Sequence, residues 1–174
     1  MRDLLRANFS RLFRSRVFLG VLLVMVGGAV AVCVDAYHSM VLYNEPGYTE
    51  PLDQVLFQAE QALGVAAAIV LSLFVGTECS GGTIRNQLMV GKNRETVYFA
   101  EYLTCAVGAF ILFMLPSLTA LALGSVLFSA PSATPGTILI AFFVGAMTCL
   151  LYAAIFHFIV VVCGSRTWAV IISL

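Results

Sequence analysis

Residues 74–102 read FVGTECSGGTIRNQLMVGKNRETVYFAEY, and this polar stretch lies between long apolar segments. Gly81 and Gly82 predict the end of the incoming helix, because glycine adopts backbone angles that other residues avoid. A short helix is then expected over residues 84–90, and Gly91 is a natural C-terminal stop for it. The stretch therefore predicts a helix end, a short isolated helix and the start of another helix.

The short helix is expected to be amphipathic. Thr83 precedes it and can accept a hydrogen bond from one of its free backbone N–H groups. Ile84 and Leu88 are four residues apart and share one face. Asn93 is placed to cap the following helix, whose first turn contains Glu95, where the helix dipole favours an acidic side chain. A short helix with an apolar face in a polar loop indicates a surface that another protein contacts.

The composition of the chain is that of a membrane protein. Its 174 residues are 61% hydrophobic and 10% charged, whereas soluble domains contain about 25% charged residues. Residues 102–165 include no Asp, Glu, Lys or Arg, and about 20 apolar residues are enough for one helix to cross a bilayer. The sequence therefore predicts an all-α polytopic membrane protein with a single transmembrane domain, residues 1–174.

Four complete membrane spans are predicted, at residues 17–34, 55–76, 97–128 and 137–163. Pro116 should kink the third span, because its ring displaces a backbone hydrogen bond. The first span could alternatively be the core of a cleaved secretory signal, although it is longer than such a core usually is. Residues 167–174 begin a fifth span but are too few to cross a bilayer. We therefore expect this sequence to be a fragment, a truncated gene product or part of a longer chain.

Residues 1–16 are expected to form an interfacial elbow helix before the first span. Drawn as a helix, residues 2–14 project five apolar side chains to one side, namely Leu4, Leu5, Phe9, Leu12 and Phe13. Arg11 and Arg14 face away from them. This pattern is typical of a helix that lies in the membrane interface. The alternative is a charged anchor with no separate helix.

The distribution of charge predicts the orientation of the chain. All nine Lys and Arg residues fall in three segments, which are residues 1–16, residues 85–94 and Arg166. Residues 35–60 contain five acidic side chains and no basic one. Because loops rich in Lys and Arg stay on the cytoplasmic side, the N-terminus, the loop at residues 78–93 and Arg166 are predicted to be cytoplasmic.

The polar stretch resembles the cytoplasmic loop of the type-2 ATP-binding-cassette (ABC-2) transporter permeases. The resemblance is carried by Glu78-Cys-Ser-Gly-Gly-Thr-Ile-Arg85, Leu88, Gly91, Arg94 and Tyr98. The sequence departs from the family pattern at Cys79, where an aromatic residue is usual, and at Glu101, where a Lys is common. The match covers residues 74–102, and it implies a six-span permease whose coupling loop is residues 78–93.

The resemblance implies the membrane-spanning subunit of an ATP-driven exporter. In this family the loop docks on a separate ATPase subunit, and two permease chains, identical or different, associate in the lipid of the membrane. A bacterial plasma membrane is the expected location, with the chain crossing it several times. The residues expected at the ATPase are Glu78, Thr83, Ile84, Arg85, Leu88, Gly91 and Arg94. Relatives handle peptide antibiotics, lipids, polysaccharides and ions, so no substrate class is indicated.

The chain is not expected to hydrolyse ATP itself. Gly91-Lys92-Asn93 resembles the end of a phosphate loop, but such a loop needs a glycine at position 86, where Asn86 stands, and Ser or Thr after the Lys. We expect no catalytic residue, cofactor or metal in this chain, with ATP and Mg²⁺ bound by the partner subunit. Nucleic-acid binding is disfavoured, because the basic residues are divided among three segments without interleaved aromatic side chains.

Two other classes of function stay open, an intramembrane enzyme and a channel or non-transport membrane scaffold. The candidate side chains for an enzyme are His38, Glu60, Glu78, Glu101 and His157. His157 lies deep in a span without a companion His or acid, so we expect it to form a hydrogen bond between helices. Glu101 is expected near Arg94 or the lipid headgroups. The five cysteines form no CxxC pair and are expected to pack between helices as small apolar residues.

Overall fold

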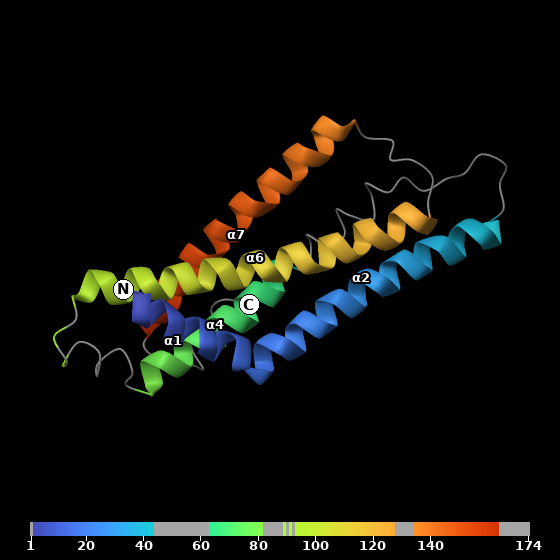
Figure 1. The fold of residues 1–174 in the computed structure, drawn as a ribbon. Helices are drawn as coiled ribbons and strands as arrows, with labels where there is room; N and C mark the ends of the chain where they lie inside the picture. Colours follow the sequence, from blue (N-terminus) through green and yellow to red (C-terminus); the bar gives the residue numbers. More distant parts are fainter. Residues whose placement is uncertain are drawn as a thin grey trace.

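The computed structural model of the chain describes residues 2–43, 63–81, 89, 91, 93–127 and 134–163. Nearly all of these residues are helical, and none of them lies in a strand. The helices, drawn in Figure 1, are α1 (Arg2–Arg14), α2 (Arg16–Tyr43), α4 (Leu63–Ser80), α6 (Arg94–Leu127) and α7 (Pro135–Cys163). The predicted all-α class is therefore confirmed for the described part of the chain.

Three helices within the described ranges are long and apolar enough to cross a membrane. Their candidate spans are Arg16–Ser39, Arg94–Leu127 and Pro135–Val162. Helix α4 contributes a shorter apolar segment, Leu63–Thr77. These helices fit the predicted multi-pass membrane protein, since about 20 apolar residues are needed for each crossing. The first part of the span predicted at 55–76 and the start of a fifth span at 167–174 lie outside the described residues.

A separate helix precedes the first span, as the sequence predicts. Helix α1 ends at Arg14, and α2 begins at Arg16 after a single intervening residue, Ser15. The Ser15 Oγ accepts a hydrogen bond from the Phe18 N–H at 3.5 Å, and the Ser15 carbonyl accepts one from the Leu19 N–H at 3.1 Å. Serine is a favoured residue at this position because its oxygen satisfies a free N–H group of the first helical turn. The break between α1 and α2 therefore depends on Ser15.

Helix α2 is longer than the predicted span at 17–34. It continues to Tyr43 and so includes Asp35, which was expected to begin an external loop. Residues 35–43 contain neither Gly nor Pro, so nothing in the local sequence ends the helix at Asp35. Helix α7 also begins earlier than predicted, at Pro135, because proline suits the first turn of a helix.

Helix α6 is the central helix of the described bundle. It contacts α1, α2, α4 and α7, and Figure 1 shows α2 running along it while α7 crosses it and diverges. Its buried face is rich in small side chains, among them Ala100, Thr104, Ala106, Gly108, Ala109, Ser117 and Ala120. Small residues let helix backbones approach closely, and in lipid this packing replaces the hydrophobic driving force between helices. Helices α2 and α7 are more exposed, as expected of helices that face lipid.

Cysteines pack at the interfaces with α6, as predicted for small apolar residues. Cys33 of α2 and Cys149 of α7 are fully buried, and each lies within weak hydrogen-bonding distance of a backbone carbonyl of α6. The S–H of Cys33 donates to the Ala120 carbonyl at 4.0 Å, and that of Cys149 donates to the Ala109 carbonyl at 3.7 Å. These contacts connect α6 to both of its long neighbours.

Polar side chains inside α6 bond to its own backbone. The Ser117 hydroxyl donates to the Phe113 carbonyl at 2.8 Å, and the Thr119 hydroxyl donates to the Pro116 carbonyl at 2.7 Å. Pro116 lies within the helix, which continues to Leu127. These bonds satisfy hydroxyl groups near the proline that would otherwise be costly to place in lipid. The kink at Pro116 stays a prediction.

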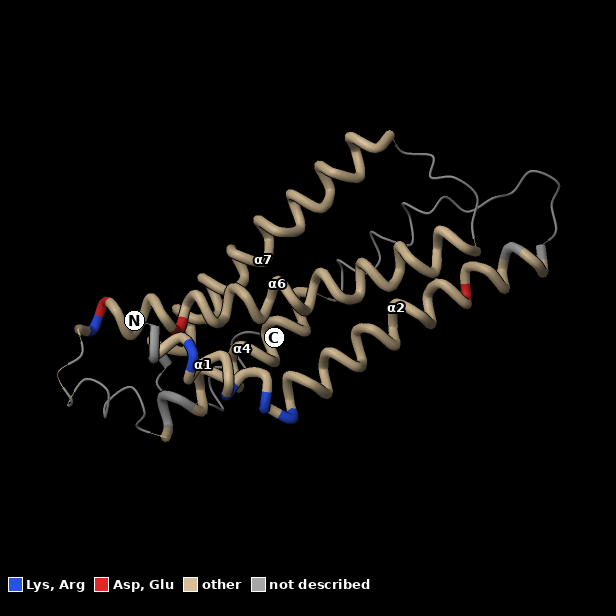
Figure 2. Tube along the Cα trace, in the orientation of Figure 1, with Lys and Arg blue, Asp and Glu red and all other residues tan. Residues whose placement is uncertain are grey.

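Charged residues gather at one end of the described bundle. Figure 2 shows Arg residues near α1 and near the starts of α2 and α6, while most of each long helix carries no charge. One acidic residue of the described part, Asp35, lies on α2 far from that end. This arrangement places the basic segments 1–16 and Arg94 at the same end, as the predicted orientation requires.

The contact between Gly145 and Phe113 predicts that α6 and α7 tolerate no added atom there. A Cβ at Gly145 would overlap the Phe113 ring, which also packs edge to face on Phe142 with centroids 5.9 Å apart. Gly145→Ala should lower the free energy of unfolding by about 1–3 kcal/mol, because an overpacked interior forces its neighbours to shift. The measurement is reversible unfolding of the purified protein in detergent, followed by circular dichroism.

Gly136→Ala is the matched control, because no atom lies within 4 Å of a Cβ added at Gly136 in the same helix. It should leave stability unchanged or slightly raised, since alanine favours helix. Adding Phe113→Leu to Gly145→Ala should recover part of the loss. Equal stability of the Gly145→Ala and Gly136→Ala proteins would contradict the close contact between Gly145 of α7 and Phe113 of α6.

Candidate functional site

The structure describes both ends of the predicted coupling loop. Helix α4 ends at Ser80 and Gly81 lies in a turn, where the sequence predicts a helix end. The Gly81 N–H donates to the Thr77 carbonyl at 2.9 Å and so closes the last turn of α4. Met89 is helical and exposed. These features agree with the predicted helix end at Gly81 and with helical structure at Met89.

Gly91 ends that segment with a left-handed backbone. Its φ is +85°, a conformation that residues with a Cβ rarely adopt. No atom lies within 4 Å of a Cβ added there, so the reason for glycine is conformational rather than steric crowding by neighbours. This backbone suits the predicted role of Gly91 as a helix stop, although the predicted helix before it, apart from Met89, lies outside the described residues. The role of Gly91 at an ATPase stays a prediction.

The helix that follows the loop begins as predicted. Asn93 precedes α6, and its carbonyl accepts a hydrogen bond from the Val97 N–H at 3.2 Å. Arg94 is the first helical residue and Glu95 lies in the first turn. Both side chains are exposed, so Arg94 is accessible to a partner at this end of the bundle.

Most of the predicted docking residues lie outside the described residues. These are Thr83, Ile84, Arg85 and Leu88. Glu78 belongs to the last turn of α4, but its side chain is also outside the described part, so its expected contact with the elbow arginines stays a prediction. The structure thus describes the two ends of the loop and leaves its apolar face, Ile84 and Leu88, to experiment.

Helix α1 packs against the start of α6, next to the loop. Leu4 is buried in a cluster with Val97 and Ala100. Two turns further on, Leu12 lies against Gly108, where an added Cβ would come within 3.1 Å of the Leu12 Cδ2 atom. The elbow helix is therefore attached to the first part of the helix that follows the loop.

This packing corrects the expected face of α1. Leu4 and Leu12 were expected to face the membrane but are buried against protein, and Asn8 lies between them at 3% exposure. Phe13 is the apolar side chain that stays exposed, at 47%. The sequence reasoning missed Asn8, although its spacing of four residues from both leucines puts it on their stripe. A polar residue on such a stripe was the available signal.

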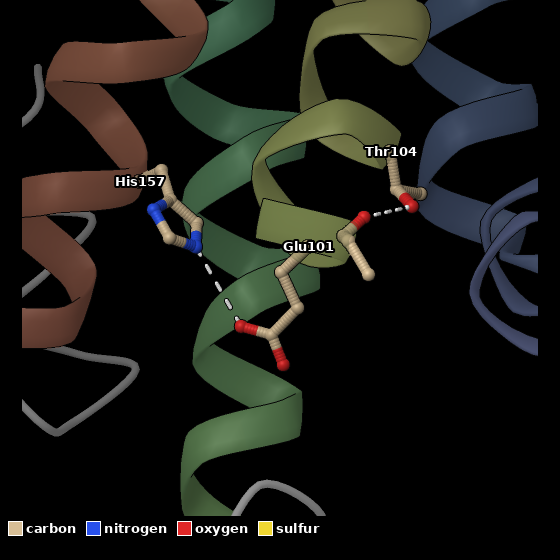
Figure 3. A network of polar contacts seen from close by, with 4 residues as sticks. Glu101, Thr104 and His157 are labelled. Carbon is tan, nitrogen blue, oxygen red and sulfur yellow. Dashed lines mark hydrogen bonds and ion pairs between the residues drawn. The ribbon is translucent and has the colours of Figure 1, made fainter. Parts of the chain in front are cut away.

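Glu101 and His157 form a buried polar pair between α6 and α7. The Glu101 Oε2 and His157 Nε2 atoms are 3.6 Å apart, with side-chain exposures of 2% and 12% (Figure 3). Neither atom forms a hydrogen bond with any of the described residues. The distance exceeds the usual 2.7–3.2 Å of an N–H···O bond, so the contact is a close pairing of two ionisable groups. The structure thus places a polar partner from another helix beside His157, but at 3.6 Å the predicted hydrogen bond between helices is not formed.

The position of Glu101 differs from the expectation. It was expected near Arg94 or the headgroups, but it is buried and turned toward α7. The cause is its place on the buried stripe of α6, between Val97 and Cys105 at spacings of four residues. The ring of Tyr102 packs edge-on against His157, with centroids 6.4 Å apart, and partly covers the pair.

The Glu101–His157 pair by itself does not supply enough ligands for a typical metal site. A metal site needs three or more ligands in most proteins, and the described residues contain no group of three His, Cys, Asp or Glu side chains that could hold an ion. The neighbouring Thr104 hydroxyl donates to the Ala100 carbonyl at 2.8 Å and so is directed at its own helix. Two facing ionisable groups can hold α6 and α7 together, and polar groups at such depth are often functional.

Comparisons of this chain with family models, with curated proteins and with solved structures found no match.

The Glu101–His157 pair predicts energetic coupling between α6 and α7. Glu101→Leu or His157→Leu alone should lower the free energy of unfolding by about 1–3 kcal/mol, because each leaves its partner buried without a polar contact. The double variant should recover most of that loss, since two apolar residues can replace a buried pair at little cost. Unfolding in detergent of all four proteins gives the coupling energy, expected to be about 0.5–3 kcal/mol.

Glu95→Leu is the control, because Glu95 is an exposed acid on the same helix. It should change stability by no more than about 0.5 kcal/mol. If the losses from the two single variants simply add in the double variant, the two side chains do not interact and the pairing is wrong.

Proposed function

We propose that this chain is the membrane-spanning permease subunit of an ATP-driven ABC transporter of the type-2 class. It works as an exporter and couples to a separate ATPase through the segment of residues 83–91. The observation that carries the proposal is the motif from Glu78 to Tyr98, which resembles the coupling loop of that family. The ends of that loop support it, because α4 ends at Ser80 and Gly91 has a left-handed backbone.

The packing of α6 supports a mechanical role for the loop. A force applied between Ser80 and Arg94 acts on α4 and α6 together, because these helices flank the loop and contact each other. Helix α6 also contacts α1, α2 and α7. Closure of the ATPase would therefore tilt α6 and carry α1 with it through the Leu4 and Leu12 contacts. In this scheme α4 and α6 act as levers.

The chemistry of ATP belongs to the partner subunit. ATP and Mg²⁺ would bind to that ATPase, and this chain would supply the docking surface and the path for substrate. A second permease chain and membrane lipid would cover the exposed apolar faces of α2 and α7, to which Leu23, Val24, Phe143 and Phe158 contribute. The location proposed is the bacterial plasma membrane.

An intramembrane enzyme is the alternative, and the buried Glu101–His157 pair is the observation that favours it. The two proposals differ in what a substitution at the pair would do. For an enzyme, Glu101→Gln would abolish activity whatever ATPase is present. For a permease, changes in the loop would have the larger effect on ATP-coupled transport.

The docking proposal predicts that the apolar face of the loop holds the ATPase. Ile84→Asp with Leu88→Asp should raise the dissociation constant of the complex about 1,000-fold, because interface anchors contribute about 2 kcal/mol or more each. Arg85→Ala should cause a smaller loss, since charges at the rim of an interface contribute less than buried apolar anchors. The measurements are co-purification of the ATPase and substrate-stimulated ATP hydrolysis in membranes.

Met89→Asp is the matched control, because Met89 is an exposed residue of the same segment and is not among the proposed docking residues. It should leave co-purification unchanged. Normal co-purification and normal hydrolysis in the double variant would refute the docking role. Loss of the double variant from the membrane would instead show that this face packs against the protein's own helices.

A further inference from the structure

A lateral cleft opens where α1, α2 and α4 meet. It consists of two cavities that share Val17 in their walls. The first has a volume of about 300 Å³ and is bordered by Arg11, Ser15 and Thr77. The second has a volume of about 600 Å³ and lies between α2 and α4. We refer to the two together as the α2–α4 cleft.

The polar side chains that line the α2–α4 cleft lie at its α1 end, in a cavity whose other walls are apolar. At the α1 end, Arg11 lies in the last helical turn and its side chain is exposed. Ser15 and Thr77 border the same cavity, and the Thr77 hydroxyl donates to the Phe74 carbonyl of its own helix at 2.6 Å. Beyond Val17 the wall of the cleft consists of glycine and apolar side chains, such as Gly20, Val21, Val24, Val65 and Ile69.

The length of the cleft corresponds to one leaflet of a bilayer. On α4 its wall extends from Thr77 to Val65, which are 12 positions apart and so about 18 Å apart along a helix. The hydrocarbon core of a membrane is about 30 Å thick, so one leaflet takes up about 15 Å. The cleft therefore extends from the interfacial helix α1 to about the middle of the membrane.

We propose that the α2–α4 cleft binds one anionic phospholipid, with its phosphate at Arg11 and an acyl chain between α2 and α4. A guanidinium group suits phosphate because it offers several N–H donors in a fixed plane. The apolar part of the cleft matches the polarity of an acyl chain, which can fill it by van der Waals contact without burying an unpaired polar group. Arg6 and Arg14 are exposed on the same helix but do not line the cleft.

This site is independent of the transport proposal. It requires only that α1 lies at the membrane surface and that α2 and α4 enter the membrane beside it. The other possible occupant is an apolar segment of protein, from this chain or from a second copy. Such a segment would fill the apolar part of the cleft but would show no preference for a lipid with a negatively charged headgroup. Lipid selectivity therefore separates the two occupants.

The test uses the full chain reconstituted in vesicles of equal parts phosphatidylglycerol and phosphatidylcholine. After extraction in mild detergent, native mass spectrometry gives the ratio of the two lipids that stay bound. The wild-type chain should retain phosphatidylglycerol preferentially. Arg11→Gln should reduce this preference about five-fold, because one basic residue at the surface contributes about 1 kcal/mol toward anionic lipid. Arg14→Gln should leave the preference nearly unchanged.

A second pair of variants tests the apolar part and leaves the charge intact. Gly20 lines the cleft and has no atom within 4 Å of an added Cβ, so Gly20→Phe should fill the space and displace bound lipid. Gly27→Phe is the matched control, because Gly27 has the same free space on the same helix and does not line the cleft. It should retain lipid as the wild-type chain does.

Three results would overturn the site. One is equal retention of the two lipids by the wild-type chain, and another is an equal loss of preference in Arg11→Gln and Arg14→Gln, which would show general attraction to a basic helix. The third is normal lipid retention by Gly20→Phe, which would show that something else occupies the cleft. If Arg11→Gln fails to fold, Arg11→Lys, which keeps the charge, and the two glycine variants decide the question.

Discussion

The close packing of other helices on the small-residue face of α6 is the constraint on which the rest of the structure depends. Lipid tails are as apolar as leucine, so helices in a membrane gain little from the hydrophobic effect and associate by close contact and polar bonds. Ala109 and Ala120 leave their carbonyls within reach of cysteine thiols from α7 and α2, and Gly108 lets Leu12 of α1 approach. A helix with large side chains on this face could not hold all its neighbours.

The same face explains why a loop at one end could influence the whole bundle. Helix α6 begins at Arg94, directly after the loop, and contacts α1 within its first turns. The residue after Ala100, Glu101, pairs with His157 of α7. A displacement of the loop would therefore act on the α1–α6 contact and on the Glu101–His157 pair, both of which lie near the loop end of α6. This arrangement fits a subunit that receives mechanical work from a partner, which is what the proposed function requires.

Several helix ends could be predicted from the sequence, but the faces by which the helices pack against one another could not. Gly81, Gly91 and Asn93 mark helix ends through backbone properties of single residues, and the structure describes them as predicted. The partners of Asn8 and Glu101 depend on which helix crosses at which height. Long apolar helices have little amphipathic pattern, so the sequence holds no signal of which face is buried. The continuation of α2 to Tyr43 was missed because charge at Asp35 was taken as a helix boundary.

The most direct test of the account is a cross-linking measurement on the loop. A photo-reactive amino acid placed at position 88 of the full chain, in membranes that contain its natural partners, should form an adduct with an ATPase that carries a phosphate-loop motif. The same group at Val126, which is 82% exposed near the opposite end of α6, should label lipid and no ATPase. Contact of position 88 with an ATPase would support the central claim. An adduct at position 88 only with other parts of the same chain would contradict it.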